Sequence, residues 1–278
     1  YTNIPPRMPS VPLQSPEKND EIFWEEYCRD ILVGAGFYES DLYEFFSEEE
    51  RAAFGMDERM MVELQNPLNA DTKYLAPAIL AKYIVSAGYN LRHADTVKIF
   101  GIQKDFRRTE DNAVRETKKL IAVQALKSSS PENFYEFKGY LDLLFEGLGI
   151  TDVSYQEGSS HTFLHPHRSA AIVDDGGEIG VIGELNPALK EKLKIRGQVM
   201  CAAIPFAHIA SRATAQAEYR PASKFPAIIR DIAVVVPGDT GAETILNIIE
   251  NTGGELLNDT DLFDYFEDEA LREENQKS

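Results

Sequence analysis

Four short motifs follow one another along this chain, and their order constrains the fold more than any single motif does. The segments 164–170 (LHPHRSA) and 223–233 (SKFPAIIRDIA) could each arise by chance. GELNP lies between them at 183–187, and LQNPLN lies upstream at 64–69. Each motif sets a proline near an apolar run, where proline marks turns and element ends. The order of the four motifs is therefore harder to attribute to chance than any one of them.

Before residue 150 the apolar periodicity is mainly helical. A spacing of three to four residues predicts helices at 18–32, 48–54, 78–91 and 134–148. The last of these has the strongest apolar stripe, formed by Phe137, Leu141, Leu144, Phe145 and Leu148. Shorter apolar runs predict strands at 42–46, 62–64, 97–102 and 120–125.

After residue 150 the apolar runs shorten and alternate, which is typical of strands. They predict strands at 153–156, 170–173, 179–183 and 199–204, with a hairpin turn at 175–177 (DGG). Pro187 suits the first turn of a helix that runs to Leu193. The segment 210–217 is small and polar, and we interpret it as a linker. A strand at 228–236, a helix at 242–251 and a strand at 262–266 would form a β-α-β unit, which is half of a ferredoxin-like fold.

These elements predict an α+β chain in three parts. Residues 1–16 hold five prolines, which fix φ and lack a backbone donor, so we expect an extended arm. Residues 17–212 are expected to form a mostly antiparallel sheet flanked by helices. Residues 213–278 are expected to hold the linker and the partial ferredoxin-like module.

Composition excludes several classes of protein. No apolar run approaches the roughly 20 residues that span a bilayer, so no membrane association is expected. The two cysteines, Cys28 and Cys201, make no disulfide framework, and no export signal precedes them; a reduced, cytoplasmic compartment fits both observations. Because the chain begins with Tyr1, we expect it to be part of a longer protein. The net charge is −18, of which −11 falls in residues 231–278, so any RNA contact must use a local basic patch.

Taken in order, the motifs resemble the C-terminal half of the β subunit of bacterial-type phenylalanyl-tRNA synthetase over nearly the whole chain. YTNIP at the start resembles the end of that family's "YGY-x-NIP" stretch, and LFD at 262–264 with QKS at 276–278 resembles its "LFD…GKKS" segment. The resemblance implies a class II synthetase-like domain without catalytic residues, followed by the first half of a ferredoxin-fold anticodon-binding domain. It also implies that the family's magnesium ligands and editing domains precede Tyr1 and that the remaining anticodon-binding strands follow Ser278.

The resemblance implies a function as well. The whole enzyme would be a heterotetrameric ligase of protein biosynthesis that joins phenylalanine to its tRNA with ATP and magnesium. This region would bind no cofactor or metal itself and would be a scaffold for the catalytic α subunit, with weak contact to the tRNA. In the family, early helices form a bundle with α, which assigns partner contacts to Ile22, Phe23, Tyr27 and Ile31 of the helix at 18–32.

Three motifs depart from the family pattern. The family's "HPGRSA" has glycine where this chain has His167, its "GELHP" has histidine where this chain has Asn186, and its "FEIG" is replaced by 100–102 (FGI). The loss of glycine indicates that the turn at His167 needs no positive φ or tolerates strain there.

Candidate chemistry is sparse. Residues 106–110 (FRRTE) are similar to the class II "FRxE" motif but one residue longer, and no arginine-containing third motif follows. We therefore predict a solvated charged loop after a strand, with no catalytic residue. His161, His165 and His167 have no cysteine nearby to complete a zinc site, so a turn is favoured in which His165 and Arg168 hold a strand edge or contact a partner.

A short basic segment is the candidate RNA site. Arg220, Lys224 and Arg230 alternate with Tyr219 and Phe225, a pattern that can bind RNA by charge and stacking. Packing of Phe225 at a domain junction explains the pattern equally well, and both interpretations stay open. Two other functions also remain: a free-standing RNA-binding or regulatory protein, and an autonomous ligase, against which the missing arginines argue.

Overall fold

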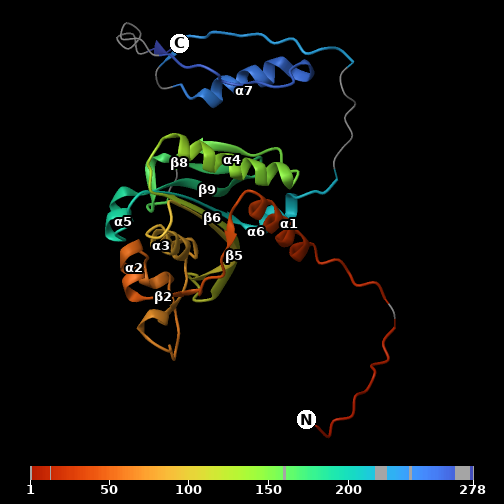
Figure 1. Ribbon diagram of the computed structural model, residues 1–278, viewed down its shortest axis with the longest axis vertical. Helices are drawn as coiled ribbons and strands as arrows, with labels where there is room; N and C mark the ends of the chain where they lie inside the picture. The colour runs from red at the N-terminus through yellow and green to blue at the C-terminus, as the bar shows by residue number, and fades with distance from the viewer. Residues whose placement is uncertain are drawn as a thin grey trace. The chain divides into compact units, whose positions relative to one another are not determined.

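The computed structural model describes residues 2–12, 14–158, 161–216, 224–237, 240–266 and 276–277. The chain divides into two compact units, Tyr1–Glu218 and Tyr219–Ser278. The first is built on a seven-stranded sheet in the order β1-β5-β6-β10-β9-β8-β7 (Figure 1). Only β1 pairs in parallel, and the other neighbours are antiparallel. The predicted mostly antiparallel sheet is confirmed.

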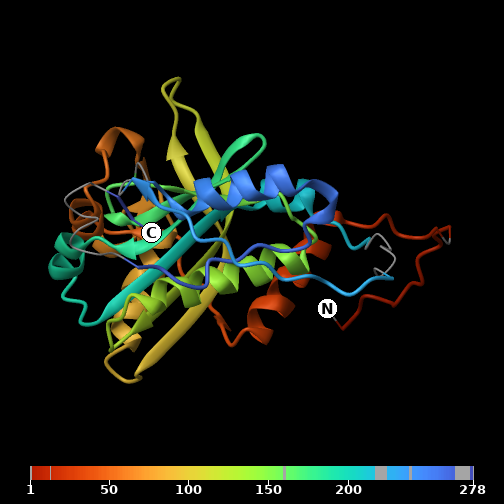
Figure 2. The ribbon, with the colours of Figure 1, turned by 90° about the horizontal axis from the view of Figure 1, so that it is seen from above.

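The strands differ widely in length. Those of the large sheet are β1 (Tyr38–Glu39), β5 (Thr96–Arg108), β6 (Val114–Leu126), β7 (Ser154–Glu157), β8 (Leu164–Asp174), β9 (Gly177–Leu185) and β10 (Gln198–Pro205). A small sheet holds β2 (Phe45–Phe46), β4 (Tyr74–Leu75) and β3 (Val62–Glu63). In Figure 2 the paired strands β5 and β6 form a long hairpin whose yellow tip projects beyond its neighbours.

Helices cover both faces of the large sheet (Figure 1). One face carries α1 (Asp20–Gly34), α4 (Glu132–Gly147) and α6 (Phe206–Arg212); the other carries α2 (Glu48–Phe54), α3 (Leu80–Asn90) and α5 (Pro187–Lys192). Successive strand residues point to opposite faces. Leu120 and Ala122 therefore join the core under α1 and α4, while Ile121 and Val123 join the core under α3.

Local capping explains where several helices begin. Ser47 and Glu50 form a capping box, and Gly55 adopts a left-handed φ of 63° after the last turn, so α2 occupies the predicted 48–54. The Asn19 side chain accepts hydrogen bonds from the first turn of α1. Asn186 caps α5 in the same way, with Pro187 at the first helical position.

Three predictions for the first unit were wrong. The segment 210–217 is not entirely linker, because α6 runs to Arg212 and buries Phe206 and Ile209. The strand predicted at 42–46 is confined to β2. The loop predicted at 106–110 is wrong in its first half, because β5 stays paired with β6 as far as Arg108.

The described residues of the second unit, 224–237, 240–266 and 276–277, contain little regular structure. Its described elements are β11 (Val236–Pro237), which pairs with β12 (Gln276–Lys277), α7 (Ala242–Gly253) and a short 3₁₀ turn. The strands predicted at 228–236 and 262–266 do not form, apart from the start of β11. Within 224–237 and 240–266, no residue with a described side chain is buried. The predicted divisions at 16/17 and 212/213 stay a prediction.

Candidate functional site

Helix α1 carries the predicted partner-binding residues, and its core side is not the one predicted. Trp24, Cys28 and Leu32 are the buried residues of α1, spaced four apart, and they pack in the same apolar cluster as α4. The predicted stripe of Ile22, Phe23, Tyr27, Ile31 and Leu32 shares only Leu32 with them. Sequence pattern missed Trp24 because two apolar stripes run side by side on this helix.

The four predicted contact residues therefore lie beside the buried stripe. Ile22 is 52% exposed and Tyr27 is 37% exposed. Phe23 and Ile31 are partly buried against the core, and the rings of Phe23 and Tyr27 stack at 6.1 Å between centroids. Of these four residues, Ile22 and Tyr27 offer an exposed apolar surface that a partner can cover without opening the core.

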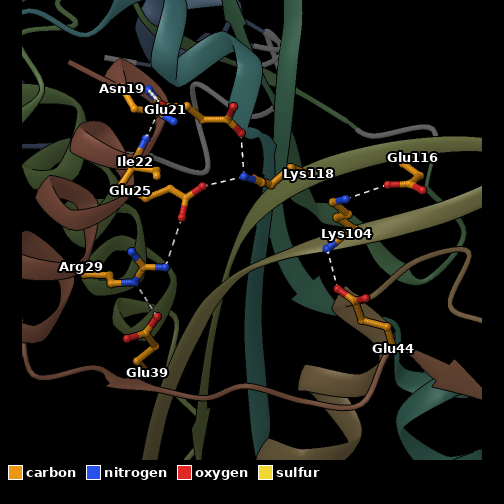
Figure 3. Close-up of polar contacts among 10 residues, drawn as sticks. All are labelled: Asn19, Glu21, Ile22, Glu25, Arg29, Glu39, Glu44, Lys104, Glu116 and Lys118. Carbon is orange, nitrogen blue, oxygen red and sulfur yellow. Dashed lines mark hydrogen bonds and ion pairs between the residues drawn. The ribbon is translucent and has the colours of Figure 1, made fainter. Parts of the chain in front are cut away.

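Carboxylates on α1 fix this helix to the sheet (Figure 3). Lys118 Nζ on β6 donates to Glu21 Oε1 and Glu25 Oε1, both at 2.6 Å. Arg29 Nε donates to Glu39 Oε1 on β1 at 2.6 Å, and Arg29 Nη2 lies 3.3 Å from Glu25 Oε2. The hydrogen bond that Arg29 donates to Glu39 is the main cause that raises the pKa of Arg29. Sequence analysis missed this network, although Glu25 and Arg29 have the spacing of a helical ion pair.

The motifs at 164–170 and 183–187 meet because β8 pairs with β9. Arg168 Nη1 donates to Glu184 Oε2 at 2.8 Å, and Gln198 Nε2 donates to the same oxygen at 3.0 Å. Gln198 Oε1 in turn accepts from Asn133 Nδ2 on α4 at 2.7 Å. Glu184 is 5% exposed, so its charge is compensated by these donors. The junction joins β8, β9, β10 and α4.

The histidines of this region lie in or next to β8. His167 N donates to His165 Nδ1 at 3.1 Å, and Asn186 Nδ2 donates to the carbonyl of Thr162 at 3.1 Å. Among the described non-glycine residues only Asn112 and Lys194 have positive φ, so His167 occupies the family's glycine position without a left-handed backbone. In the described ranges no group of three or more His, Cys, Asp or Glu could hold a metal ion.

Arg107 and Arg108 were predicted to face solvent, but both side chains donate hydrogen bonds to backbone carbonyls. Arg107 Nε donates to the carbonyl of Pro77 at 2.8 Å, and Arg108 Nε donates to the carbonyl of Met61 at 3.3 Å. Both side chains are half-buried. They tie the hairpin of β5 and β6 to the segments before α3.

The predicted RNA-binding residues belong to the second unit. Arg220 lies outside the described residues. Lys224 and Arg230 are exposed, and Arg230 Nη1 donates to the carbonyl of Ile229 at 3.2 Å. Phe225 is 81% exposed. Lys224 and Phe225 are both exposed, but no described contact brings Lys224 and Arg230 together.

Both units match models of known protein families. Residues 4–206 match the family model described as phenylalanyl tRNA synthetase beta chain CLM domain, and residues 223–278 match the ferredoxin-fold anticodon binding domain. The phenylalanine–tRNA ligase β subunit of Symbiobacterium thermophilum is 33% identical over 225 residues, which is 77% of this chain and 25% of that protein. The β subunit of Listeria monocytogenes is 28% identical over 288 residues, covering 100% of this chain and 36% of that protein. The chain thus spans about a quarter to a third of the length of these relatives.

Solved structures are similar in fold. Pyrrolysyl-tRNA synthetase from Desulfitobacterium hafniense superposes with a TM-score of 0.57 and 16% identity, covering 68% of this chain and 67% of that one. At this identity the likeness shows the synthetase fold alone. In the described part of the chain, no helix has the length and hydropathy to cross a membrane.

Proposed function

This chain belongs to the phenylalanyl-tRNA synthetase β-chain family, and we propose from that premise that it is the part of a phenylalanine–tRNA ligase β subunit that supports the catalytic α subunit. The family match over residues 4–206 is the observation that carries the proposal. The whole enzyme would attach phenylalanine to its tRNA with ATP and magnesium, which the α subunit would bind. The match gives no support to a free-standing regulatory protein.

We propose that the chain alone does not activate phenylalanine. Arg107 and Arg108 resemble synthetase arginines in sequence, but each has its Nε bonded to a backbone carbonyl. Removing one preorganised charge-stabilising donor costs an enzyme about 10²–10³ in rate, and here the ATP-binding pair is missing. Phenylalanine-dependent pyrophosphate exchange should not exceed a no-enzyme control. Exchange above that control would overturn this part of the proposal.

We propose that Ile22 and Tyr27 lead the contact with the α subunit, with Phe23 and Ile31 as partly buried members of the same face. The double variant Ile22→Asp/Tyr27→Asp should weaken α binding at least about tenfold, because a buried interface disfavours unpaired carboxylates. Calorimetric titration with the α subunit measures this effect. Leu68→Asp/Tyr89→Asp is the matched control, since both side chains are exposed and neither lies on α1. Equal binding by both variants would refute the assignment.

The tRNA contact is proposed for the second unit, supported by its match to an anticodon-binding domain. Lys224 and Arg230, with Arg220, would supply a weak, salt-sensitive contact beside the acidic residues Asp259, Asp261 and Asp264. The logarithm of the tRNA association constant falls linearly with the logarithm of the salt concentration. Lys224→Ala/Arg230→Ala should make this negative slope shallower by about 2. Lys18→Ala/Arg59→Ala, which removes two exposed cations from the first unit, should leave the slope unchanged. Tight, salt-insensitive binding by the unaltered chain would contradict the proposal.

A further inference from the structure

A small pocket opens on the α3 side of the large sheet, away from α1 and from the junction of Arg168 with Glu184. Strands β5, β6, β9 and β10 form its floor, and the start of α3 with residues 161–163 forms its wall. Its volume is about 130 Å³. An engineered cavity of about 150 Å³ in another protein admits benzene, so this pocket can hold a ligand of similar size.

The polar side of the pocket contains the ion pair of Asp105 with Lys119, the cation Arg107, and the side chains of His161 and Glu178. Asp105 is 2% exposed; its Oδ1 accepts from the Ile79 backbone N–H at 2.6 Å, and its Oδ2 pairs with Lys119 Nζ at 2.7 Å. Both oxygens of Asp105 are therefore used within the protein, and Lys119 compensates its charge. Asp105 does not oppose the entry of an anion as an unpaired carboxylate would.

Arg107 is the available cation. Its Nε donates to the Pro77 carbonyl, which fixes the plane of the guanidinium group. For Nη1 and Nη2 the described part of the chain provides no hydrogen bond or ion pair. A guanidinium edge with two parallel N–H donors matches the two oxygens of a carboxylate.

The remaining wall is apolar. Leu80, Phe163, Val181 and Ala203 line it together with Pro205. A ligand that fills the pocket must therefore combine one anionic group with a short hydrocarbon part. Glu178 is exposed and also lines the pocket. Its carboxylate repels an anion in the pocket, and it repels a doubly charged anion more strongly than a monoanion.

We propose that this pocket binds a small monocarboxylate with a short branched hydrocarbon tail, its carboxylate on the guanidinium edge of Arg107 and its tail against Phe163 and Val181. The proposal does not depend on the proposed contacts with the α subunit or with tRNA, because no residue of the α1 face or of the basic segment takes part in it. The volume excludes a nucleotide.

Calorimetric titration of the full chain with isovalerate tests the proposal. For a ligand of this size we expect a dissociation constant on the order of 1 mM. Arg107→Gln should weaken binding at least about tenfold. Arg115→Gln is the matched control: it removes the same charge from the position paired with Arg107 across the hairpin, outside the pocket lining. Equal loss in both variants would show a general charge effect and overturn the site.

Two further measurements keep the result independent of stability. Ala203→Val narrows the pocket from β10, where a β-branched residue suits the strand, and should weaken binding while the melting temperature is retained. Burial lowers the pKa of His161; Glu178 raises it, and Lys119 and Arg107 lower it. A carboxylate bound on Arg107 offsets the effect of that cation and should raise the pKa of His161 in an NMR titration. An unchanged His161 titration with saturating isovalerate, or equally tight binding of inorganic phosphate, would refute the proposal.

Discussion

The two units of this chain contain similar apolar residues but use them differently. In the first unit, helices cover both faces of the sheet, and rings such as Phe100 and Phe137 are fully buried. In the second, Ile229 is 85% exposed and Phe263 is 74% exposed. An apolar run becomes a stable strand only when another layer covers it, because hydrophobic stabilisation follows the area removed from water.

The largest expected effect separates the two units directly. Phe137→Ala should cost about 3–5 kcal/mol of unfolding free energy, because it leaves a cavity in the core under α4. Phe263→Ala, the same change at an exposed ring, should cost less than about 0.5 kcal/mol. Urea unfolding followed by Trp24 fluorescence and by circular dichroism measures both. A cost above about 2 kcal/mol for Phe263→Ala would show that the second unit also buries its rings, and would break the comparison.

The next effect tests a buried charge of the first unit. Arg168→Met removes one of two donors from Glu184 Oε2 and should cost about 1–2 kcal/mol; the lower end accounts for the 55% exposure of the Arg168 side chain. Arg230→Met in the second unit removes only a bond to a neighbouring carbonyl and should be nearly neutral. Equal stability of the two variants in urea would mean that the junction of β8 and β9 does not depend on this pair.

Alkaline pH provides a further test, because both thiols belong to the first unit. Burial raises the pKa of Cys28 and of Cys201 to about 12. Unfolded thiols lose their protons near about pH 8.5, so unfolding releases protons above that pH and stability falls as pH rises. Between pH 7.5 and 9.5 the loss should be about 1 kcal/mol per thiol. The double variant Cys28→Ala/Cys201→Ala should show a flatter pH profile in urea unfolding under reducing conditions, and an equally steep one would contradict the assignment.

The smallest effect concerns ion pairs within the first unit. Lys118→Ala should cost about 0.5–1 kcal/mol, because Lys118 bonds two α1 carboxylates and the Glu25 side chain is only 13% exposed. Lys104→Ala removes a pair with Glu116 in which both side chains are about half exposed, and should cost no more than about 0.5 kcal/mol. The difference in melting temperature between the two variants measures this ranking, and the reverse order would refute it.

Sequence alone predicted the elements whose causes are local. The capping box at Ser47 and the stripe of α4 define their helices without help from distant residues. Helix α6 was missed because Phe206 and Ile209 are its only buried positions and the rest of the segment consists of small and polar residues. The strands predicted at 228–236 and 262–266 do not form, apart from the start of β11. Alternating apolar residues show that a segment could present one apolar face, but they do not show whether another layer covers that face.

The candidate site was predicted in the same uneven way. The motifs at 164–170 and 183–187 were found, but the bond of Arg168 with Glu184 depends on the register of β8 and β9, which no single motif contains. The sequence predicted that the Arg107 side chain would face solvent, but it is half-buried. Its position follows from the length of the β5–β6 hairpin and from the Pro77 carbonyl beside it.

The strand order of the large sheet also determines when each strand can pair during translation. β6 pairs with β5 as soon as both are made, but its other neighbour is β10, and Leu126 must wait for Gln198. At about 5–20 residues per second, the 72 residues from 127 to 198 take roughly 4–14 s to translate. During that interval the run at 120–126 (LIAVQAL) presents an open apolar edge, to which other nascent chains can pair. We therefore expect the yield of folded protein to depend on how fast a ribosome crosses residues 127–198, a stretch that contributes α4, β7 to β9 and α5.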